Sequence, residues 1–402
     1  MKARSRADTP LAVALGVALL AGILVDWSPR YWRVSVTIAG ISLVGAIWAL
    51  MTRHVSLPLQ TVLIALIAIW GPLQLGLHLT RAPWPTLQRS IEWATGGVCF
   101  VLGTQILRGQ RSRDAFLNLM LCAMTVLAVA AMLQMYITPG KVFGIIPVGD
   151  NVVGTMYYKN WFAAMMELAA PIALWRVYNG KIFSGGLCYA AMFAATITSA
   201  SRMGVVLVLA EFLVTLLLMV VGRRTPVKSA VSVVGILALL VAAASGVAGT
   251  EKIWERLREP EAYALRGTLL AATLKMIPVH PWFGSGLGTW PSEYPGFANG
   301  DSGLYVNAAH NDWAQWASEG GLPFFLLMAA LAILLFKPSV ESVWGIGVLG
   351  VLIHAFVDYP LQDPALACLW FAWAGGLTTL HPGRERNEEQ KRFSRAAAEA
   401  SK

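Results

Sequence analysis

Charged side chains are scarce in this sequence. They make up 13% of the 402 residues, whereas 56% are hydrophobic, and an ordinary soluble domain carries roughly 25% charged residues. Cysteines are also few: the four of them lie in separate apolar runs without the spacing of metal ligands. The shortage of charge excludes a soluble enzyme, and the cysteines support neither a disulfide framework nor a zinc site. One polytopic membrane domain is the class that remains.

Long apolar runs take the place of the missing charge. A helix that crosses a bilayer needs about 17 to 25 mostly apolar residues, and such runs predict an all-α polytopic membrane protein with about twelve spans. They cover residues 10–27, 34–52, 55–79, 91–107, 115–138, 161–178, 183–201, 204–222, 229–249, 322–336, 341–357 and 365–380. We expect residues 1–381 to form the transmembrane domain and residues 382–402 to be a solvated tail.

Basic residues are distributed unequally between the two sides of these spans. With the N-terminus in the cytoplasm, 19 of the 31 Lys and Arg residues fall on the inner side. Cytoplasmic loops of membrane proteins carry such an excess. We therefore expect both termini in the cytoplasm, and the net charge of +9 is an orientation signal that requires no nucleic-acid partner.

The outer segment 250–321 is much longer than the other loops, and such loops are usually functional. Its pattern predicts a helix over residues 263–277 that carries Arg266 on its apolar face. Arg266 then faces the membrane domain, either as a site residue or as an interfacial arginine whose charged head reaches water. A second predicted helix begins at Asn307 as N-cap and ends at Gly320 and Gly321.

His310 and Asn311 lie in the first turn of that second predicted helix. The helix dipole disfavours an imidazolium there, and a neutral imidazole accepts a proton from an attacking hydroxyl; a hydrogen-bonded structural histidine is the alternative. Glu319 is interpreted as a residue that ends the helix. Three alternate glycines in 284–288 follow a helix rather than a strand, so they predict a tight turn against another backbone and not a nucleotide site.

Other polar residues lie at the membrane boundary or within the spans. Arg202 stands at the outer end of span seven, and Lys159 and Asn160 stand at the outer start of span six. Ionisable residues at membrane depth are functional candidates. Glu167 and Glu211 lie inside spans six and eight, and the sequence leaves open which basic residue either of them pairs with. Cations with few acids near them suit an anionic, phosphorylated substrate presented from the outer leaflet.

Four motifs, in order, resemble the O-antigen ligase and O-antigen polymerase superfamily of bacterial envelope glycosyltransferases. Residues 154–163 (GTMYYKNWFA) resemble the start of one of its membrane helices, and residues 201–204 resemble its Ser-Arg-Gly motif with Met203 inserted. Residues 266–288 resemble its succession of arginine, helix, His-Pro and alternate glycines. Residues 310–323 resemble its His-Asn and glycine signature, and residues 358–364 resemble a fifth, weaker element.

The resemblance implies a GT-C-like fold and a metal-independent, inverting glycosyltransferase that uses no cofactor. Its donor would be an undecaprenyl-diphosphate-linked glycan. The protein would lie in the bacterial inner membrane in contact with membrane lipids, and its active site would face the periplasm. Carried over by motif, Arg202 and Arg266 bind the diphosphate, and His310 is the base or positions the acceptor. Lys159, Asn160 and Asn311 are further candidates for substrate binding.

The acceptor is left open by the sequence. A ligase would transfer the glycan to lipid A-core, which we favour; a polymerase would use a second lipid-linked glycan acceptor; a third alternative is transfer to a protein. A transporter is the alternative from another class. Transporters often show repeated halves and place polar residues near the bilayer midplane, whereas here the polar residues gather at the outer boundary and the halves show no repeat.

Overall fold

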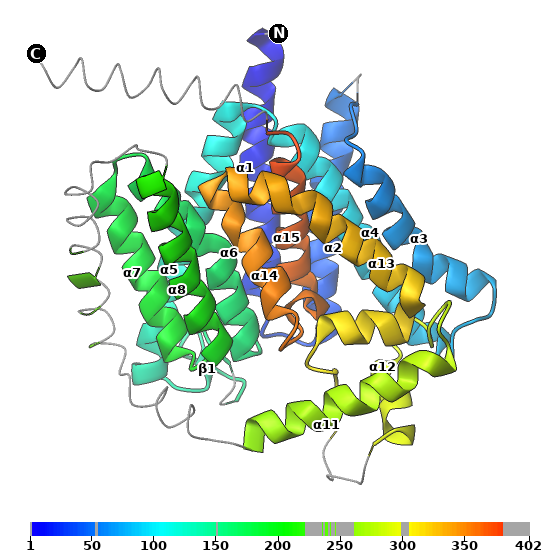
Figure 1. Ribbon diagram of the computed structural model, residues 1–402. Coiled ribbons are helices and arrows are strands. Elements are labelled where there is room, and N and C mark those ends of the chain that lie inside the picture. Colours follow the sequence, from blue (N-terminus) through cyan, green and yellow to red (C-terminus); the bar gives the residue numbers. More distant parts are fainter. Residues whose placement is uncertain are drawn as a thin grey trace, which may run out of the picture.

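The structure is a computed structural model that describes residues 2–52, 55–149, 152–221, 261–298 and 305–380, with a few single positions between 235 and 246. Helices form most of it (Figure 1). The main helices are α1 (Lys2–Leu24), α2 (Arg30–Met51), α3 (Gln60–Gly76), α4 (Pro83–Ile106), α5 (Gln110–Ile137), α6 (Lys159–Tyr178), α7 (Ile182–Thr198), α8 (Arg202–Val221), α11 (Glu261–Met276), α13 (Asp312–Glu341), α14 (Ile346–His354) and α15 (Pro364–Leu377). The short ones are η1 (Ile277–Val279), α12 (Trp290–Glu293), η2 (Tyr294–Gly296), η3 (Val343–Gly345) and η4 (Pro360–Gln362).

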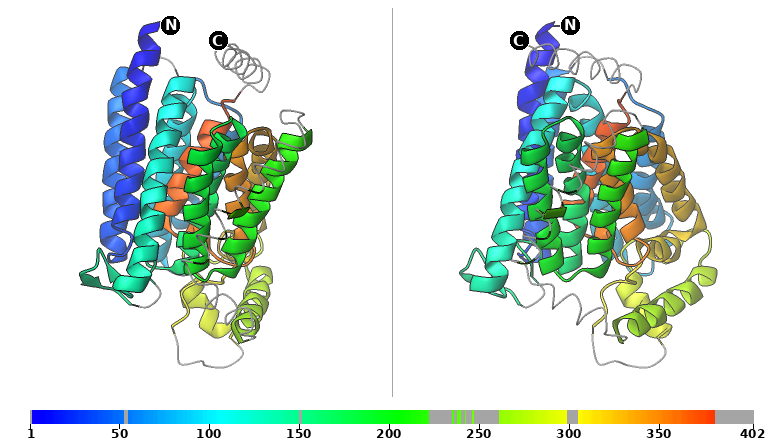
Figure 2. Two further views of the ribbon diagram at one scale, coloured as in Figure 1. Left: turned by 90° about the vertical axis from the view of Figure 1, so that its left-hand side faces the viewer. Right: turned by 60° about the vertical axis from the view of Figure 1, so that its left-hand side comes forward.

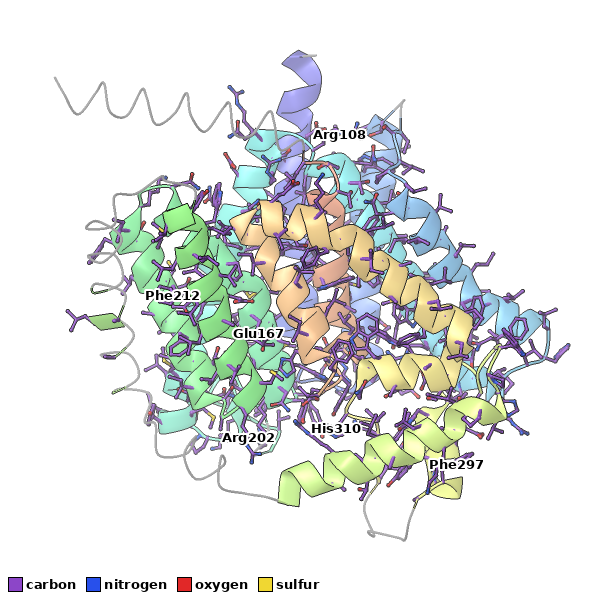
Figure 3. All side chains as sticks on the ribbon, viewed as in Figure 1. Arg108, Glu167, Arg202, Phe212, Phe297 and His310 are labelled. Carbon is purple, nitrogen blue, oxygen red and sulfur yellow. The ribbon has the colours of Figure 1, made fainter. Side chains whose placement is uncertain are left out.

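The helices form an up-and-down bundle that is covered at one end. Helices α11 and α12 lie across that end, which we call the α11 end (Figures 1 and 2). Arg202 and His310 lie near the α11 end, Glu167 lies within the bundle, and Arg108 lies at the opposite end (Figure 3). The polar residues that the motifs single out therefore gather at one end of the bundle.

Burial divides the helices into central and peripheral ones. Almost every residue of α6 and α15 is buried, whereas α2 and α3 each bury only a few residues and expose large apolar side chains such as Leu43, Val62 and Ile69. Four described helices, α2, α5, α8 and α13, are long and apolar enough to cross a membrane, and five shorter helices are apolar as well. An apolar exterior of this extent is typical of an integral membrane protein.

The number of spans is only partly accounted for. The predicted spans up to residue 222 each coincide with a helix from α1 to α8, but the ninth, 229–249, lies almost wholly outside the described residues. Helix α4 begins at Pro83, eight residues before the predicted span 91–107. Its first turns carry Arg89 and Glu92, whose side chains form an ion pair at 2.7 Å. Hydropathy counts each of these residues as charged although they neutralise one another, so it placed the start of this helix too late.

Helix α13 contains a sharp kink at Gly321, where φ is 76°. Residues 312–320 lie along the α11 end and residues 322–341 continue into the bundle (Figure 1). The predicted helix end at Gly320 and Gly321 is therefore confirmed. The predicted start at Asn307 is wrong: Asn311 is the N-cap, and its side chain accepts a hydrogen bond from the Ala314 N–H.

A β-hairpin at the α11 end departs from the all-α expectation. Strands β1 (Lys141–Val142) and β2 (Ile146–Pro147) pair antiparallel, with Lys141 opposite Pro147. Strands of two residues are too short for an alternating apolar pattern to predict them. The hairpin lies in the connection between α5 and α6.

Candidate functional site

A cavity of about 270 Å³ lies at the α11 end, where four parts of the chain meet. Its walls come from the start of α6, the turn between α7 and α8, the middle of α11, and the loops that flank α13 and α14. Five of the six residues predicted from the sequence line it: Lys159, Asn160, Arg202, Arg266 and His310. The fold therefore brings together residues that the motifs identified separately.

Asp358 connects three of these walls through one carboxylate. Its Oδ2 accepts hydrogen bonds from Nη2 of Arg266, at 2.8 Å, and from Nδ2 of Asn160. Its Oδ1 accepts from the N–H of Tyr359 and lies 3.6 Å from Nδ1 of His310, which is an electrostatic contact rather than a hydrogen bond. In the sequence, Asp358 lies in the weakest of the five motifs, and no role was predicted for it.

The pKa of Asp358 follows from these contacts. Burial raises the pKa of a carboxyl group, but the neighbouring imidazole of His310 and the guanidinium of Arg266 outweigh burial and hold the pKa of Asp358 below its ordinary value. Asp358 is therefore a carboxylate at neutral pH. It keeps Arg266 in place through the 2.8 Å hydrogen bond from Nη2.

His310 is held in an unusual backbone conformation. Its φ is 51°, in the left-handed region, which costs a residue with a side chain on the order of 1–3 kcal/mol. Its ring makes edge-to-face contacts with Tyr359 and Tyr158, with 4.7 and 6.3 Å between the ring centroids. Because the chain bends here, His310 precedes the N-cap of α13 and lies outside the helix. The expectation of a first-turn histidine is corrected, and the carboxylate of Asp358 is its electrostatic partner.

Arg202 is the first residue of α8, after a tight turn at the end of α7. Ala200 in that turn has φ of 54°. Gly204 packs against α6: a Cβ at Gly204 would lie 2.6 Å from Cβ of Ala163. This close approach explains the glycine of the Ser-Arg motif, because a larger residue would push the start of α8 away from α6 and move Arg202 with it.

The two asparagines have different positions. Nδ2 of Asn160 donates to Asp358 and to the Tyr158 hydroxyl, so Asn160 holds the cavity wall together. Asn311 does not line the cavity: its Oδ1 accepts from the Ala314 N–H, and its Nδ2 donates to the Phe356 carbonyl at 2.7 Å. Asn311 therefore ties α13 to the loop that carries Asp358.

Asp312 also holds the loop that carries Asp358, a role that was not predicted from the sequence. Its N–H donates to the carbonyls of Ala355 and Asp358. Its carboxylate accepts from the N–H of Leu361, at 2.9 Å, and from Nε2 of Gln362, at 2.8 Å. An aspartate beside a motif histidine was the available signal, but its partners come from residues far along the chain.

The buried acids of the bundle differ in their pairing. Both oxygens of Glu167 lie within hydrogen-bond distance of Nδ1 of His354, at 2.8 and 3.0 Å. The partner of Glu167, which the sequence left open, is therefore His354, and His354 also lines the cavity. The carboxylate oxygens of Glu211, by contrast, are buried and make no hydrogen bond to the described residues.

The glycine turn is structural, as predicted. Gly284 has φ of 71°, and a Cβ there would lie 2.1 Å from the carbonyl oxygen of Glu319. The Glu319 carboxylate accepts from the N–H groups of Gly288 and Trp290, at 2.8 and 3.0 Å. The interpretation of Glu319 as a simple helix end is therefore wrong. Because a buried carboxylate already occupies these two amides, they are not available to a phosphate.

The charge of the cavity lining favours an anion. Lys159, Arg202 and Arg266 bring positive charge, and Asp358 is the acidic residue among the lining residues. Guanidinium groups suit phosphate oxygens because their N–H groups match in pairs. In the described part of the chain, no three His, Cys, Asp or Glu side chains come together as metal ligands do.

Comparison with known families assigns the middle of the chain. Residues 187–329 match the family model described as O-antigen ligase. The match includes Arg202, Arg266 and His310; Lys159 and Asp358 lie outside it and reach the same cavity through the fold. A comparison with curated proteins gave no match. Over residues 187–329, this helical membrane protein is therefore similar to the O-antigen ligase family, whose members are glycosyltransferase-like enzymes.

Proposed function

We propose that this protein is a glycosyltransferase of the ligase type, which moves a glycan from undecaprenyl diphosphate to a hydroxyl of lipid A-core. The proposal places a GT-C-like frame of about twelve spans in the bacterial inner membrane, with both termini in the cytoplasm and the cavity facing the periplasm. The convergence of Lys159, Arg202, Arg266 and His310 on one cavity carries the proposal, and the family match to residues 187–329 supports it.

The donor diphosphate is assigned to the cationic wall. Arg202 and Arg266 take the phosphate oxygens, with Lys159 beside them. Asp358 holds Nη2 of Arg266 at 2.8 Å, so the guanidinium is oriented before the substrate arrives. As the bond to the sugar breaks, negative charge grows on the diphosphate, and oriented donors stabilise it. Removal of one such donor lowers kcat by about 10²–10³ in other enzymes.

The acceptor hydroxyl is assigned to the side of His310. In the proposed step its oxygen attacks the anomeric carbon, the bond from that carbon to the diphosphate oxygen breaks, and the electron pair leaves with the diphosphate. The proton of the hydroxyl goes to the imidazole of His310, and the anomeric configuration inverts. Asp358, 3.6 Å from Nδ1 of His310, stabilises the resulting imidazolium. The proposal uses no metal ion and no cofactor.

Product analysis tests this function. Purified protein is incubated with undecaprenyl-diphosphate-linked glycan and either lipid A-core or a second lipid-linked glycan. Glycan on lipid A-core is the expected product; a longer lipid-linked glycan would make the protein a polymerase, and a protein-linked glycan would identify a protein acceptor. If the donor is never consumed but crosses the bilayer of liposomes unchanged, the protein is a transporter and the proposal is wrong.

Variants of the cavity test the assigned residues. His310→Ala and Arg266→Ala should abolish turnover and leave expression near normal. Arg81→Gln is a matched control, because Arg81 is an exposed arginine at the same end of the bundle and interacts with His280 rather than with the cavity. If either cavity variant keeps most of its activity while the control behaves like wild type, the role given to that residue is wrong.

A further inference from the structure

A second cavity lies at the α11 end, and the proposed function does not use it. Its volume is about 470 Å³. The turn between α1 and α2 forms one wall, the first turn of α2 forms another, and the hairpin residues 146–148 close it. Its lining includes the side chains of Trp27, Ser28, Arg30, Arg33 and Tyr157. Figures 1 and 2 show the hairpin at the same end of the bundle as α11.

Two arginines in this wall are held in place by buried carboxylates that lie outside the cavity. Nε and Nη2 of Arg30 donate to Glu92, with Nη2 at 2.7 and 2.9 Å from the two carboxylate oxygens. Nη1 of Arg33 lies 3.1 Å from Oδ1 of Asp26. Glu92 and Asp26 are buried and do not line the cavity. Within the described residues, Nη1 of Arg30 and Nη2 of Arg33 make no hydrogen bond, so each retains two N–H groups for a ligand.

Further hydrogen-bond donors of the same wall lack partners. Nε1 of Trp27, the hydroxyl of Ser28 and Nε of Arg33 are buried and make no hydrogen bond to the described residues. Such unsatisfied donors are rare in folded proteins and costly when no acceptor reaches them. The indole and guanidinium groups only donate, so the missing partner is a group with acceptor oxygens. The wall therefore favours a ligand rich in oxygen atoms. Buried carboxylates compensate the charges of its two arginines, but the guanidinium N–H groups that make no hydrogen bond to the described residues suit the oxygens of a phosphate or carboxylate group.

The second cavity is connected to the first through aromatic side chains. Tyr157 lines the second cavity and the next residue, Tyr158, lines the first. The guanidinium of Arg33 lies over the ring of Trp161, 5.4 Å from its centroid. Trp161 in turn packs edge-on against Tyr158 and Tyr359, both at 5.6 Å. Aromatic side chains therefore lie between the two cavities, and ligands bound in the two cavities would lie on either side of them.

We propose that the second cavity binds the acceptor, and that the acceptor is an anionic glycan with phosphate or carboxylate groups on its sugars. The inference rests on the proposed function, because an inverting transfer requires the acceptor to approach from the side opposite the leaving diphosphate. Arg30 and Arg33 bind the anionic groups, and the rings of Trp27 and Tyr157 pack against sugar faces. The first cavity holds the diphosphate, and the attacking hydroxyl reaches it past Tyr158.

The test compares two acceptors that differ only in charge: a phosphorylated core oligosaccharide and the same oligosaccharide after dephosphorylation. Arg30→Gln should raise the KM for the phosphorylated acceptor about tenfold, as expected for the loss of one charge-assisted hydrogen bond. The KM for the dephosphorylated acceptor and the KM for the lipid-linked donor should stay near the wild-type values. Equal effects on donor and acceptor, or no effect on the acceptor, would overturn the proposal.

Two more variants separate binding from folding. Tyr157→Ala keeps the backbone N–H that donates to Asp26 at 3.0 Å, and it should raise the KM for both acceptors because the stacking ring is lost. Arg108→Gln, at the opposite end of the bundle, is the matched control and should change neither KM. If Tyr157→Ala leaves both acceptor KM values unchanged, the cavity is not the acceptor site.

Calorimetric titration of the phosphorylated oligosaccharide, without donor, gives a readout independent of turnover. Wild-type protein should bind it, and the Arg30→Gln variant should bind it about tenfold more weakly. If wild-type protein consumes the donor but does not bind the oligosaccharide, the acceptor proposal is wrong and the proposed function stands. If it binds the oligosaccharide and never consumes the donor, the cavity binds an anionic glycan and the proposed function is wrong.

Discussion

At the scale of single residues, Asp358 is the side chain on which the arrangement of the first cavity depends. It pairs with Arg266 at 2.8 Å, accepts from Asn160 and lies beside His310. These three partners come from α11, from α6 and from the loop before α13. A change at Asp358 therefore alters the orientation of a cation, the hydrogen bond of an amide and the charge beside an imidazole at once.

Asp358→Asn should lower kcat by about 10²–10³, the range for loss of an oriented charge in an active site. The amide keeps the shape of the side chain but removes the charge that stabilises an imidazolium at His310 and holds Arg266. Steady-state kinetics of glycan transfer is the measurement. Glu341→Gln, which changes an exposed acid at the end of α13, is the control. Near-normal kcat in Asp358→Asn would show that Asp358 does not support the proposed reaction.

The lowered pKa of Asp358 predicts a dependence of stability on pH. A carboxyl group whose folded pKa lies below its unfolded value of about 3.9 stabilises the fold above that pH. This stabilisation is lost as the pH falls through the folded value. The thermal midpoint of the wild-type protein in detergent should therefore fall more steeply below about pH 4 than that of Asp358→Asn. Parallel curves for the two proteins would contradict the cause given for the shift.

The buried acids of the bundle provide a matched comparison. Glu167→Gln weakens the contact with Nδ1 of His354, which is 2.8 Å long in the native protein, and should lower stability by about 1–3 kcal/mol. Glu211→Gln replaces a buried carboxylate without a partner in the described residues by a neutral group of the same shape, and should leave stability unchanged or higher. Thermal unfolding in detergent measures both, and equal losses would show that the pairing with His354 does not matter.

At the scale of elements, the glycine turn after η1 fixes where α11 joins the bundle. Gly286 donates to the carbonyl of Glu319, and Gly288 donates to its carboxylate. Gln74 of α3 donates to the same carbonyl at 2.8 Å. The turn is thereby attached to α13 and α3, and it fixes the position of α11, which carries Arg266 and precedes the turn in the chain.

Gly284→Ala should destabilise the protein by at least about 1–3 kcal/mol, because an alanine at φ of 71° is strained and its Cβ would overlap the Glu319 carbonyl. Gly267→Ala is the matched control: Gly267 lies in α11, and a Cβ there meets no atom within 4 Å. That substitution should stabilise α11 by about 0.5–1 kcal/mol. Thermal unfolding in detergent measures both changes, and a neutral Gly284→Ala would contradict the packing described.

At the scale of the whole molecule, the bundle has two chemically different ends. The cavity with Arg202 and His310 lies at the α11 end, and Arg108 lies at the other (Figure 3). The excess of basic residues on the predicted inner side belongs to the end with Arg108. The side of the membrane that the cavity faces therefore depends on which end of the bundle lies in the cytoplasm.

Cysteine labelling measures that sidedness. In a variant whose four native cysteines are replaced by alanine, Tyr305→Cys should react with a membrane-impermeant thiol reagent in spheroplasts, because Tyr305 is 83% exposed and lies in the connection between η2 and α13. Arg108→Cys should react only after the membrane is permeabilised. The reverse pattern would place the cavity in the cytoplasm and exclude a periplasmic donor.

The sequence by itself determined the class of protein, most helix positions and five residues of the first cavity. Hydropathy and motif spacing are local properties, so they identify apolar runs and boundary residues such as Lys159 and Arg202 wherever the chain goes next. Two helix starts were predicted wrongly. The start of α4 was placed too late because its charged residues neutralise one another in an ion pair, and the start of α13 was placed too early because the chain bends at His310.

Only the tertiary structure decided which polar groups meet. Arg266 and Asp358 are 92 residues apart, and Asn160 and Asp358 are 198 apart. His354 was found as the partner of Glu167 across 187 residues. The physical reason is that a buried charge is stabilised by the group it contacts in space, and no periodicity along the chain encodes that contact. The second cavity follows the same rule, because its arginines belong to α2 and its hairpin residues lie between α5 and α6.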